Sequence, residues 1–158
     1  MDLTRLRLGE WVAAAGGVAL IASLALDWYG AQGRAGALSG FESFSVVDVL
    51  LVALAALAIG LAVAQATRRS PTVPVAAAVL TVVAGLLAVL VVAYRIVDQP
   101  GPNEFVDVRA GAWVGLAATA AVLVGGWASL RNEHVPGEGP PADVELRPAP
   151  RIAPDAEP

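Results

Sequence analysis

Four long runs of this chain contain no charged residue and consist mainly of Ala, Val, Leu and Gly. They cover residues 11–26, 49–67, 70–94 and 110–130. A helix rises about 1.5 Å per residue, so about 20 residues cross a hydrocarbon core of about 30 Å. None of the runs has polar positions at helical spacing, which excludes ordinary surface helices. The pattern predicts an all-α domain over 1–130, an antiparallel bundle of four transmembrane helices at about 10–29, 46–66, 73–97 and 110–130.

The aromatic residues follow the same four runs. Amphipathic rings favour the headgroup region, where an apolar face and a polar N–H or O–H both find suitable surroundings. All four Trp and both Tyr lie near predicted span ends, and we expect them to be interfacial: Trp11 and Trp127 on one side, Trp28, Tyr29, Tyr94 and Trp113 on the other.

The distribution of Arg predicts the orientation. Basic residues are more frequent on the cytoplasmic side of a membrane protein. One side carries Arg5, Arg7, Arg68, Arg69 and Arg131, and the other carries Arg34, Arg95 and Arg109. This asymmetry predicts a multi-pass protein of the plasma membrane with both ends in the cytoplasm. A cleaved signal peptide is the alternative for the first run, but Asp27, Trp28 and Tyr29 separate its apolar part from the small residues at 35–37.

The last 28 residues differ from the rest of the chain. They are polar and include seven Pro. Such a segment buries too little apolar area to offset its ordering entropy. We therefore predict a disordered cytoplasmic tail over 131–158.

Composition restricts the classes of function. The 158 residues are 57% hydrophobic and 15% charged, whereas soluble domains carry about 25% charged residues. The net charge of −4 and the absence of a basic stripe argue against a nucleic-acid partner. The chain has no Cys, and its one His, His134, lies in the tail. We therefore expect no metal site and no cofactor.

Candidate catalytic residues are also lacking. No run carries a central Ser/His, Asp/Asp or Glu/His set, and no Gly-rich phosphate loop is present. Glu10 is the closest candidate for a membrane carboxylate, but its place beside Trp11 at the edge of the first run predicts an interfacial position. The chain is predicted not to be an enzyme.

Four charges gather at the outer ends of the predicted spans, namely Asp27, Asp48, Arg95 and Arg109. Two interpretations remain open. They form a buried charge cluster at a shallow outer vestibule, or each serves its own helix end. In the second case residues 45–48 form a capping box, and Arg95 lies where the helix dipole favours a cation.

Small residues recur at four-residue spacing, which favours close helix packing inside lipid. The predicted packing residues are Ala56, Gly60, Ala64, Gly111 and Gly115. We expect these residues either to make contacts within the bundle or to form a face that binds a second copy or another partner. In the outer loop, Phe41 and Phe44 are expected to share one face of a helical turn on the membrane surface.

Three sequence motifs form a recognisable set. They are the Trp28-Tyr29 pair after the first run, the sequence Phe44-Ser45-Val46-Val47-Asp48, and the sequence of residues 95–100. With these motifs, residues 8–131 resemble uncharacterised small four-helix integral membrane proteins of high-GC actinobacteria. The resemblance implies the topology and supplies no activity. The topology is also claudin-like, but the outer loop lacks the paired cysteines of that group, so this analogy is architectural.

These observations favour a small non-enzymatic membrane protein, a structural or accessory component of the cell membrane. Its expected partners are the lipid bilayer and another membrane protein or a second copy of itself. The alternative is a small transporter or channel subunit that acts as an oligomer. A water-accessible polar residue in mid-membrane would favour the alternative, and Thr81 and Thr119 are the only candidates in the last two runs.

Overall fold

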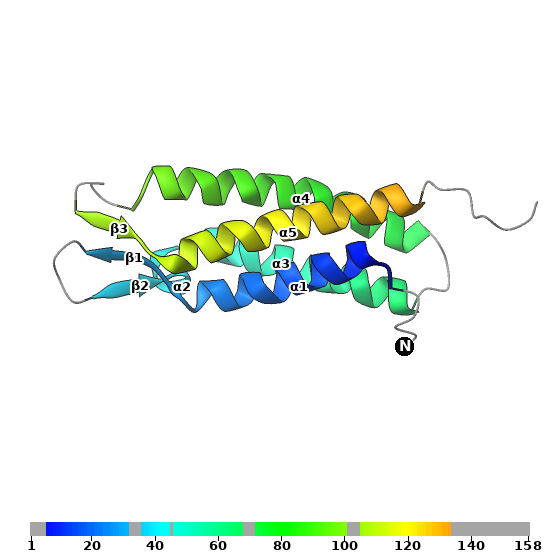
Figure 1. Cartoon of the computed structure of the whole chain (residues 1–158), viewed down its shortest axis with the longest axis horizontal. Helices are drawn as coiled ribbons and strands as arrows, with labels where there is room; N and C mark the ends of the chain where they lie inside the picture. The colour runs from blue at the N-terminus through cyan, green and yellow to red at the C-terminus, as the bar shows by residue number, and fades with distance from the viewer. Residues whose placement is uncertain (1–5, 32–35, 45, 68–71, 101–104, 134–158) are drawn as a thin grey trace, which may run out of the picture.

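The computed structural model describes residues 6–31, 36–44, 46–67, 72–100 and 105–133. It is mostly helical, and four helices form its body: α1 (Leu8–Leu24), α3 (Val47–Thr67), α4 (Thr72–Val97) and α5 (Ala110–Glu133). They lie side by side, and consecutive ones run in opposite directions (Figure 1). α1 packs against α3 and α5, and α4 packs against the same two helices.

Three of these helices are long and apolar enough to cross a membrane, over Val47–Thr67, Ala76–Val97 and Ala110–Arg131. α1 is apolar but shorter, with 17 residues. It ends earlier than the predicted span 10–29, because the N–H groups of Ala25 and Leu26 bond back to the carbonyl oxygens of Ala22 and Ser23. The chain then becomes extended.

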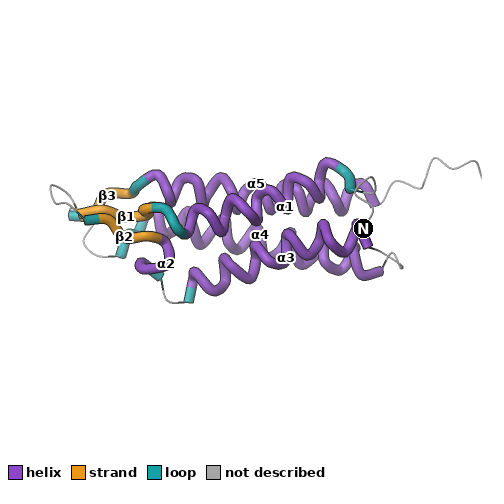
Figure 2. The backbone as a smooth tube through the Cα atoms, turned by 90° about the horizontal axis from the view of Figure 1, so that it is seen from below, coloured by secondary structure: helices purple, strands orange, loops and turns teal. Residues whose placement is uncertain are grey.

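A small antiparallel sheet covers one end of the helices. The all-α prediction did not include this sheet. It contains β1 (Asp27–Ala31), β2 (Ala37–Ser39) and β3 (Val106–Val108), in the order β2-β1-β3. The short helix α2 (Gly40–Ser43) follows β2. We call this end of the molecule the sheet end, and the opposite end, where α1 begins and α5 finishes, the terminal end (Figure 2).

Glycines set the closest helix contacts. A Cβ atom at Gly125 of α5 would lie 2.7 Å from the carbonyl oxygen of Gly9 and would clash with the backbone N of Ala13. At Gly16 of α1 it would lie 2.9 Å from the backbone N of Val122. The backbones of α1 and α5 therefore touch along much of their length.

The other contacts use different glycines. Gly17 brings α1 to within reach of the Ala55 carbonyl of α3, and Gly85 brings α4 against the backbone of Leu123 in α5. α3 and α4 have no such glycine contact, and their interface is the least extensive of the four.

The structure does not place Ala56 and Gly60 in a helix interface of this chain, and Ala64 is half-buried. Ala56 and Gly60 are exposed, and a Cβ atom at Gly60 would meet no described atom within 4 Å. The neighbouring face of α3, with Ala55 and Ala58, is buried instead. Of the two interpretations of this stripe, contacts within the bundle are therefore not seen for Ala56 and Gly60, and a dimer or partner face stays a prediction.

Part of the predicted topology falls outside the described residues. This applies to Arg5, Arg34, Arg68 and Arg69. It also applies to the tail from residue 134, including His134, while α5 continues through 131–133 of the segment predicted as tail.

Candidate functional site at the sheet end

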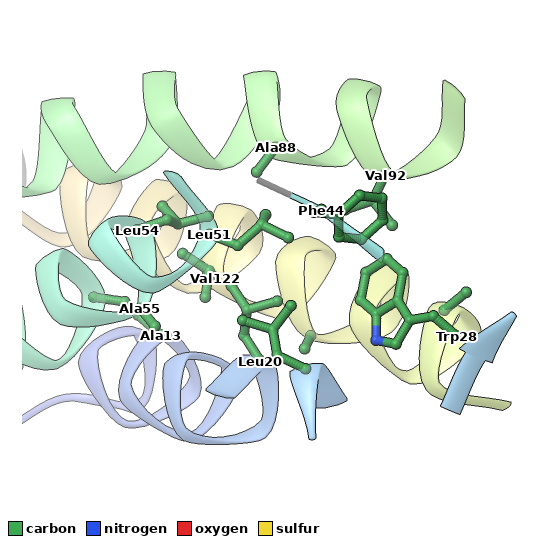
Figure 3. Close-up of a cluster of buried hydrophobic side chains, with 14 of the residues drawn as sticks. Ala13, Leu20, Trp28, Phe44, Leu51, Leu54, Ala55, Ala88, Val92 and Val122 are labelled. Atoms are coloured by element: carbon green, nitrogen blue, oxygen red, sulfur yellow. The ribbon is translucent and has the colours of Figure 1, made fainter. Parts of the chain in front are cut away.

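Trp28 of β1 is the central side chain of the sheet end, and it is fully buried. Its Nε1–H donates a hydrogen bond of 2.7 Å to the carbonyl oxygen of Ser23, near the end of α1. Its ring meets Phe44 edge-on, with 5.1 Å between the ring centroids. Figure 3 shows these rings beside Val92 of α4. Trp28 thus joins the sheet to the helices.

Three glycines make room for the indole. A Cβ atom at Gly115 would lie 2.5 Å from Cζ2 of Trp28, and one at Gly40 would lie 2.9 Å from Nε1. At Gly111 it would lie 2.7 Å from Cδ1. Gly111 and Gly115, predicted as helix-packing residues, therefore accept a ring from the sheet.

Tyr29 extends the aromatic cluster toward α4. Its hydroxyl donates to the backbone carbonyl of Arg95 at 3.0 Å, and its ring centroid lies 6.0 Å from that of Phe44. Burial raises the pKa of Tyr29 to about 12, and the nearby positive charge of Arg95 opposes this shift. A phenol is neutral at physiological pH even at its ordinary pKa of about 10, so the Tyr29 hydroxyl is available as a donor.

The predicted interfacial aromatics fall into two groups. Trp11, Tyr94, Trp113 and Trp127 are half or more exposed at the ends of their helices. Trp28 and Tyr29 are buried, so the interfacial prediction is wrong for this pair. Sequence placed them at a span end but did not show that the chain folds back there as a strand.

Phe41 and Phe44 do not share a face. Phe41 lies in α2 and is 45% exposed, whereas Phe44 follows α2 in extended conformation and is buried against Trp28. In this loop the structure describes a capping box at the start of α2, formed by Ser39, the residue before the helix, and Glu42 within it. The Ser45 of the predicted box lies outside the described residues.

The four outer charges lie at the sheet end, and each has contacts of its own. The guanidinium of Arg95 lies over the Phe44 ring, 5.5 Å from its centroid. The carboxylate of Asp48 accepts the N–H of Val49 at 2.8 Å. Arg109 lies against Gly30, where a Cβ atom would be 2.7 Å from Nη2, and Asp27 is exposed. Within the described ranges, none of the four is ion-paired with another, which favours the interpretation of separate local roles.

A double-mutant cycle tests this separation. We expect the losses of unfolding free energy in Asp48→Asn and Arg95→Gln to add, with a coupling below about 0.5 kcal/mol, because coupling beyond that requires contact. The measurement is chemical unfolding in detergent of the two single variants and the double variant. A coupling above about 1 kcal/mol would restore the buried pair.

A second polar group lies at the terminal end and was not predicted. Glu10 is the third residue of α1, so it lies at a helix end as predicted, but it is 2% exposed and therefore buried inside the protein. Its carboxylate accepts the hydroxyl of Ser129 at 2.7 Å, the backbone N–H of Arg7 at 2.7 Å and the amide of Gln65 at 3.5 Å. Sequence reasoning missed it because Gln65 and Ser129 belong to other helices and match no motif with Glu10.

Removal of this carboxylate should destabilise the bundle. We expect Glu10→Leu to cost about 2 kcal/mol of unfolding free energy, because the buried hydroxyl of Ser129 loses its acceptor. Glu10→Gln should cost less, since an amide oxygen can still accept one of these bonds. Unfolding midpoints of the two variants in the same detergent make the comparison. Equal midpoints for both variants and the unaltered protein would show that the hydrogen bonds contribute no net stability.

The outer face of the sheet is hollowed. A depression of about 300 Å³ is lined by Tyr29, Gly30, Leu38, Pro100 and Val106, among others. Leu38 and nearby Phe105 are 50% and 65% exposed. Because the strand order is β2-β1-β3, both β2 and β3 are edge strands.

Metal ligands do not gather in this region. Among the residues that the structure describes, no group of three or more His, Cys, Asp or Glu side chains could hold a metal ion. Comparisons of the chain with protein-family models, curated proteins and solved structures find no match.

Proposed function

We propose that the chain is a small non-enzymatic protein of the plasma membrane whose sheet end docks another membrane or envelope component. In this proposal α1, α3, α4 and α5 form an antiparallel transmembrane bundle with both chain ends in the cytoplasm. Three apolar helices of spanning length support this placement. α1 is apolar and shorter, and it packs against α3 and α5.

The observation that carries the docking role is the rigid attachment of the sheet to the helices. The N–H of Arg109 donates to the Trp28 carbonyl at 2.8 Å, and the N–H of Gly40 donates to the Leu26 carbonyl at 3.3 Å. β3 ends two residues before α5 begins. A sheet fixed in this way presents its edge strands in a constant geometry, which suits the addition of a partner strand.

Crosslinking in native membranes tests the docking role. A photoreactive phenylalanine analogue at Leu38 or Phe105 should capture a discrete partner, because both side chains are exposed beside the sheet edges. The same analogue at Trp127, which is 56% exposed near the terminal end, is the matched control. Identical products from all three positions, or none at the sheet, would contradict the proposal.

Thiol labelling tests the orientation. The chain contains no Cys, so each introduced thiol is unique. Cysteine at Ala37, exposed in β2, should react with an impermeant reagent in intact cells, whereas cysteine at Thr67, exposed at the end of α3, should react only after permeabilisation. The reverse pattern would place the sheet in the cytoplasm.

The buried carboxylate of Glu10 favours a second candidate, a small transporter. It lies among α1, α3 and α5 with Gln65 and Ser129, at the terminal end of the bundle. A buried carboxylate there would be the first group to bind an ion or proton that enters the bundle from the cytoplasm. Proteoliposomes with an imposed proton gradient test this candidate. Flux that requires the protein and is lost in Glu10→Gln would support transport, and a flux equal to that of empty liposomes would remove it.

A further inference from the structure

An apolar groove of about 270 Å³ lies between α3 and α4. Its lining is formed only by Ala, Val and Leu, from Val47 to Leu57 on α3 and from Ala84 to Val91 on α4. Leu51, Leu54 and Ala88 are buried and form its floor (Figure 3), whereas Leu50 and Leu87 are about 60% exposed at its rims.

The groove exists because this helix pair lacks a close contact. Glycines bring α1 against α3 and α5, and α4 against α5. On α3, Gly60 faces away from the other described residues. The side chains of α3 and α4 therefore hold the two helices apart, and the lining has no polar side chain that would attract water.

The length and depth of the groove match one leaflet. Val47 to Leu57 covers ten helical steps, or about 15 Å, which is half of a hydrocarbon core of about 30 Å. The groove begins at the first residue of α3, so it occupies the half of the bundle next to the sheet. In the proposed membrane placement its natural occupant is one acyl chain of the outer leaflet.

A cation follows the groove lining on α4. Arg95 follows Val91 by one helical turn and so lies on the same face of α4. Its guanidinium rests on Phe44 and has no ion-pair partner in the described part of the chain. A guanidinium binds phosphate through paired N–H donors. Asp48 is the second residue of α3, so a carboxylate lies at the same depth as the end of the groove, which favours a headgroup that also carries an ammonium over a purely anionic one.

We propose that this groove is a phospholipid site, with one acyl chain between α3 and α4 and the lipid phosphate at Arg95. The inference rests on the proposed membrane placement and is independent of the docking role of the sheet. The site holds an individual lipid in a fixed position, unlike the bulk lipid around the remaining helix faces.

Photocrosslinking of the full chain in vesicles tests the site. The probe is phosphatidylethanolamine with a diazirine in the middle of one acyl chain. Label should concentrate in peptides from 47–57 and 84–91. Ala53→Phe fills the groove from its rim and should remove most of this label, because the phenyl ring occupies the space that the acyl chain would take. Ala56→Phe, also exposed on α3 but outside the lining, is the matched control.

The headgroup contact is tested separately by native mass spectrometry. Arg95→Gln should lower the fraction of protein that retains phosphatidylethanolamine on transfer from detergent, while Arg109→Gln should not. Label spread evenly over all four helices would show bulk lipid only and overturn the site. Protein–protein crosslinks through 47–57 would assign the groove to a second copy. A chain without any label would instead contradict the membrane placement.

Discussion

Gly125→Ala should destabilise the protein strongly, whereas Gly60→Ala should not. The added Cβ atom at Gly125 meets backbone atoms of α1, with the Gly9 carbonyl oxygen at 2.7 Å and the Ala13 nitrogen still closer. Backbone atoms cannot rotate away as the end of a side chain can, so the two helices must separate. We expect a loss of unfolding free energy of about 2 kcal/mol or more, in the upper part of the usual range for overpacking.

Gly60→Ala is the matched control, because it makes the same chemical change in another helix. A Cβ atom there meets no described atom within 4 Å, and Ala is the better helix former by up to about 1 kcal/mol. Its unfolding midpoint in detergent should be unchanged or slightly higher. A larger loss at Gly60 than at Gly125 would mean that α3 uses the Ala56-Gly60-Ala64 stripe in a tight dimer and that the α1–α5 contact is compliant.

The contrast between these glycines shows what the sequence could predict. Apolar runs predicted the helices, and α3 begins and ends within one residue of the predicted span. The spacing of small residues predicted close packing, but a helix rich in Ala and Gly has such residues on several faces. The face that meets a neighbour is decided by the three-dimensional arrangement, here by Gly17 of α1 against Ala55.

The sheet end was harder to predict for a different reason. Its strands are three to five residues long and come from loops more than 70 residues apart, since β1 pairs with β3. Strands this short carry little periodicity, and their pairing depends on the helices that bring the loops together. The aromatic residues were a usable signal, because Trp28, Tyr29 and Phe44 are all placed in this region. The sequence did not predict their burial, because that burial depends on the strand turning back over the helices.

Trp28→Ala should be the most damaging change at the sheet end. The side chain is fully buried, and its loss leaves a cavity among Phe44, Gly111 and Gly115 that the surrounding backbone cannot easily close. Removal of a buried Trp typically costs about 3–5 kcal/mol. Trp28→Phe should cost less, because the Ser23 carbonyl still accepts the N–H of Leu26 and the lost hydrogen bond contributes about 1 kcal/mol.

Trp113→Ala is the control for the loss of an indole, since Trp113 is 56% exposed at the same end of the molecule. Its unfolding midpoint in detergent should stay close to that of the unaltered protein. Because Trp28 joins β1 to α1 and α5, Trp28→Ala should also increase the reaction of a cysteine at Ser23, which is fully buried and whose carbonyl accepts the indole N–H. If Trp28→Ala and Trp113→Ala shift the midpoint equally and the cysteine at Ser23 stays protected, the indole does not hold the sheet to the helices. The rigid presentation on which the docking role depends would then have to come from the backbone bonds of Arg109 and Gly40 alone.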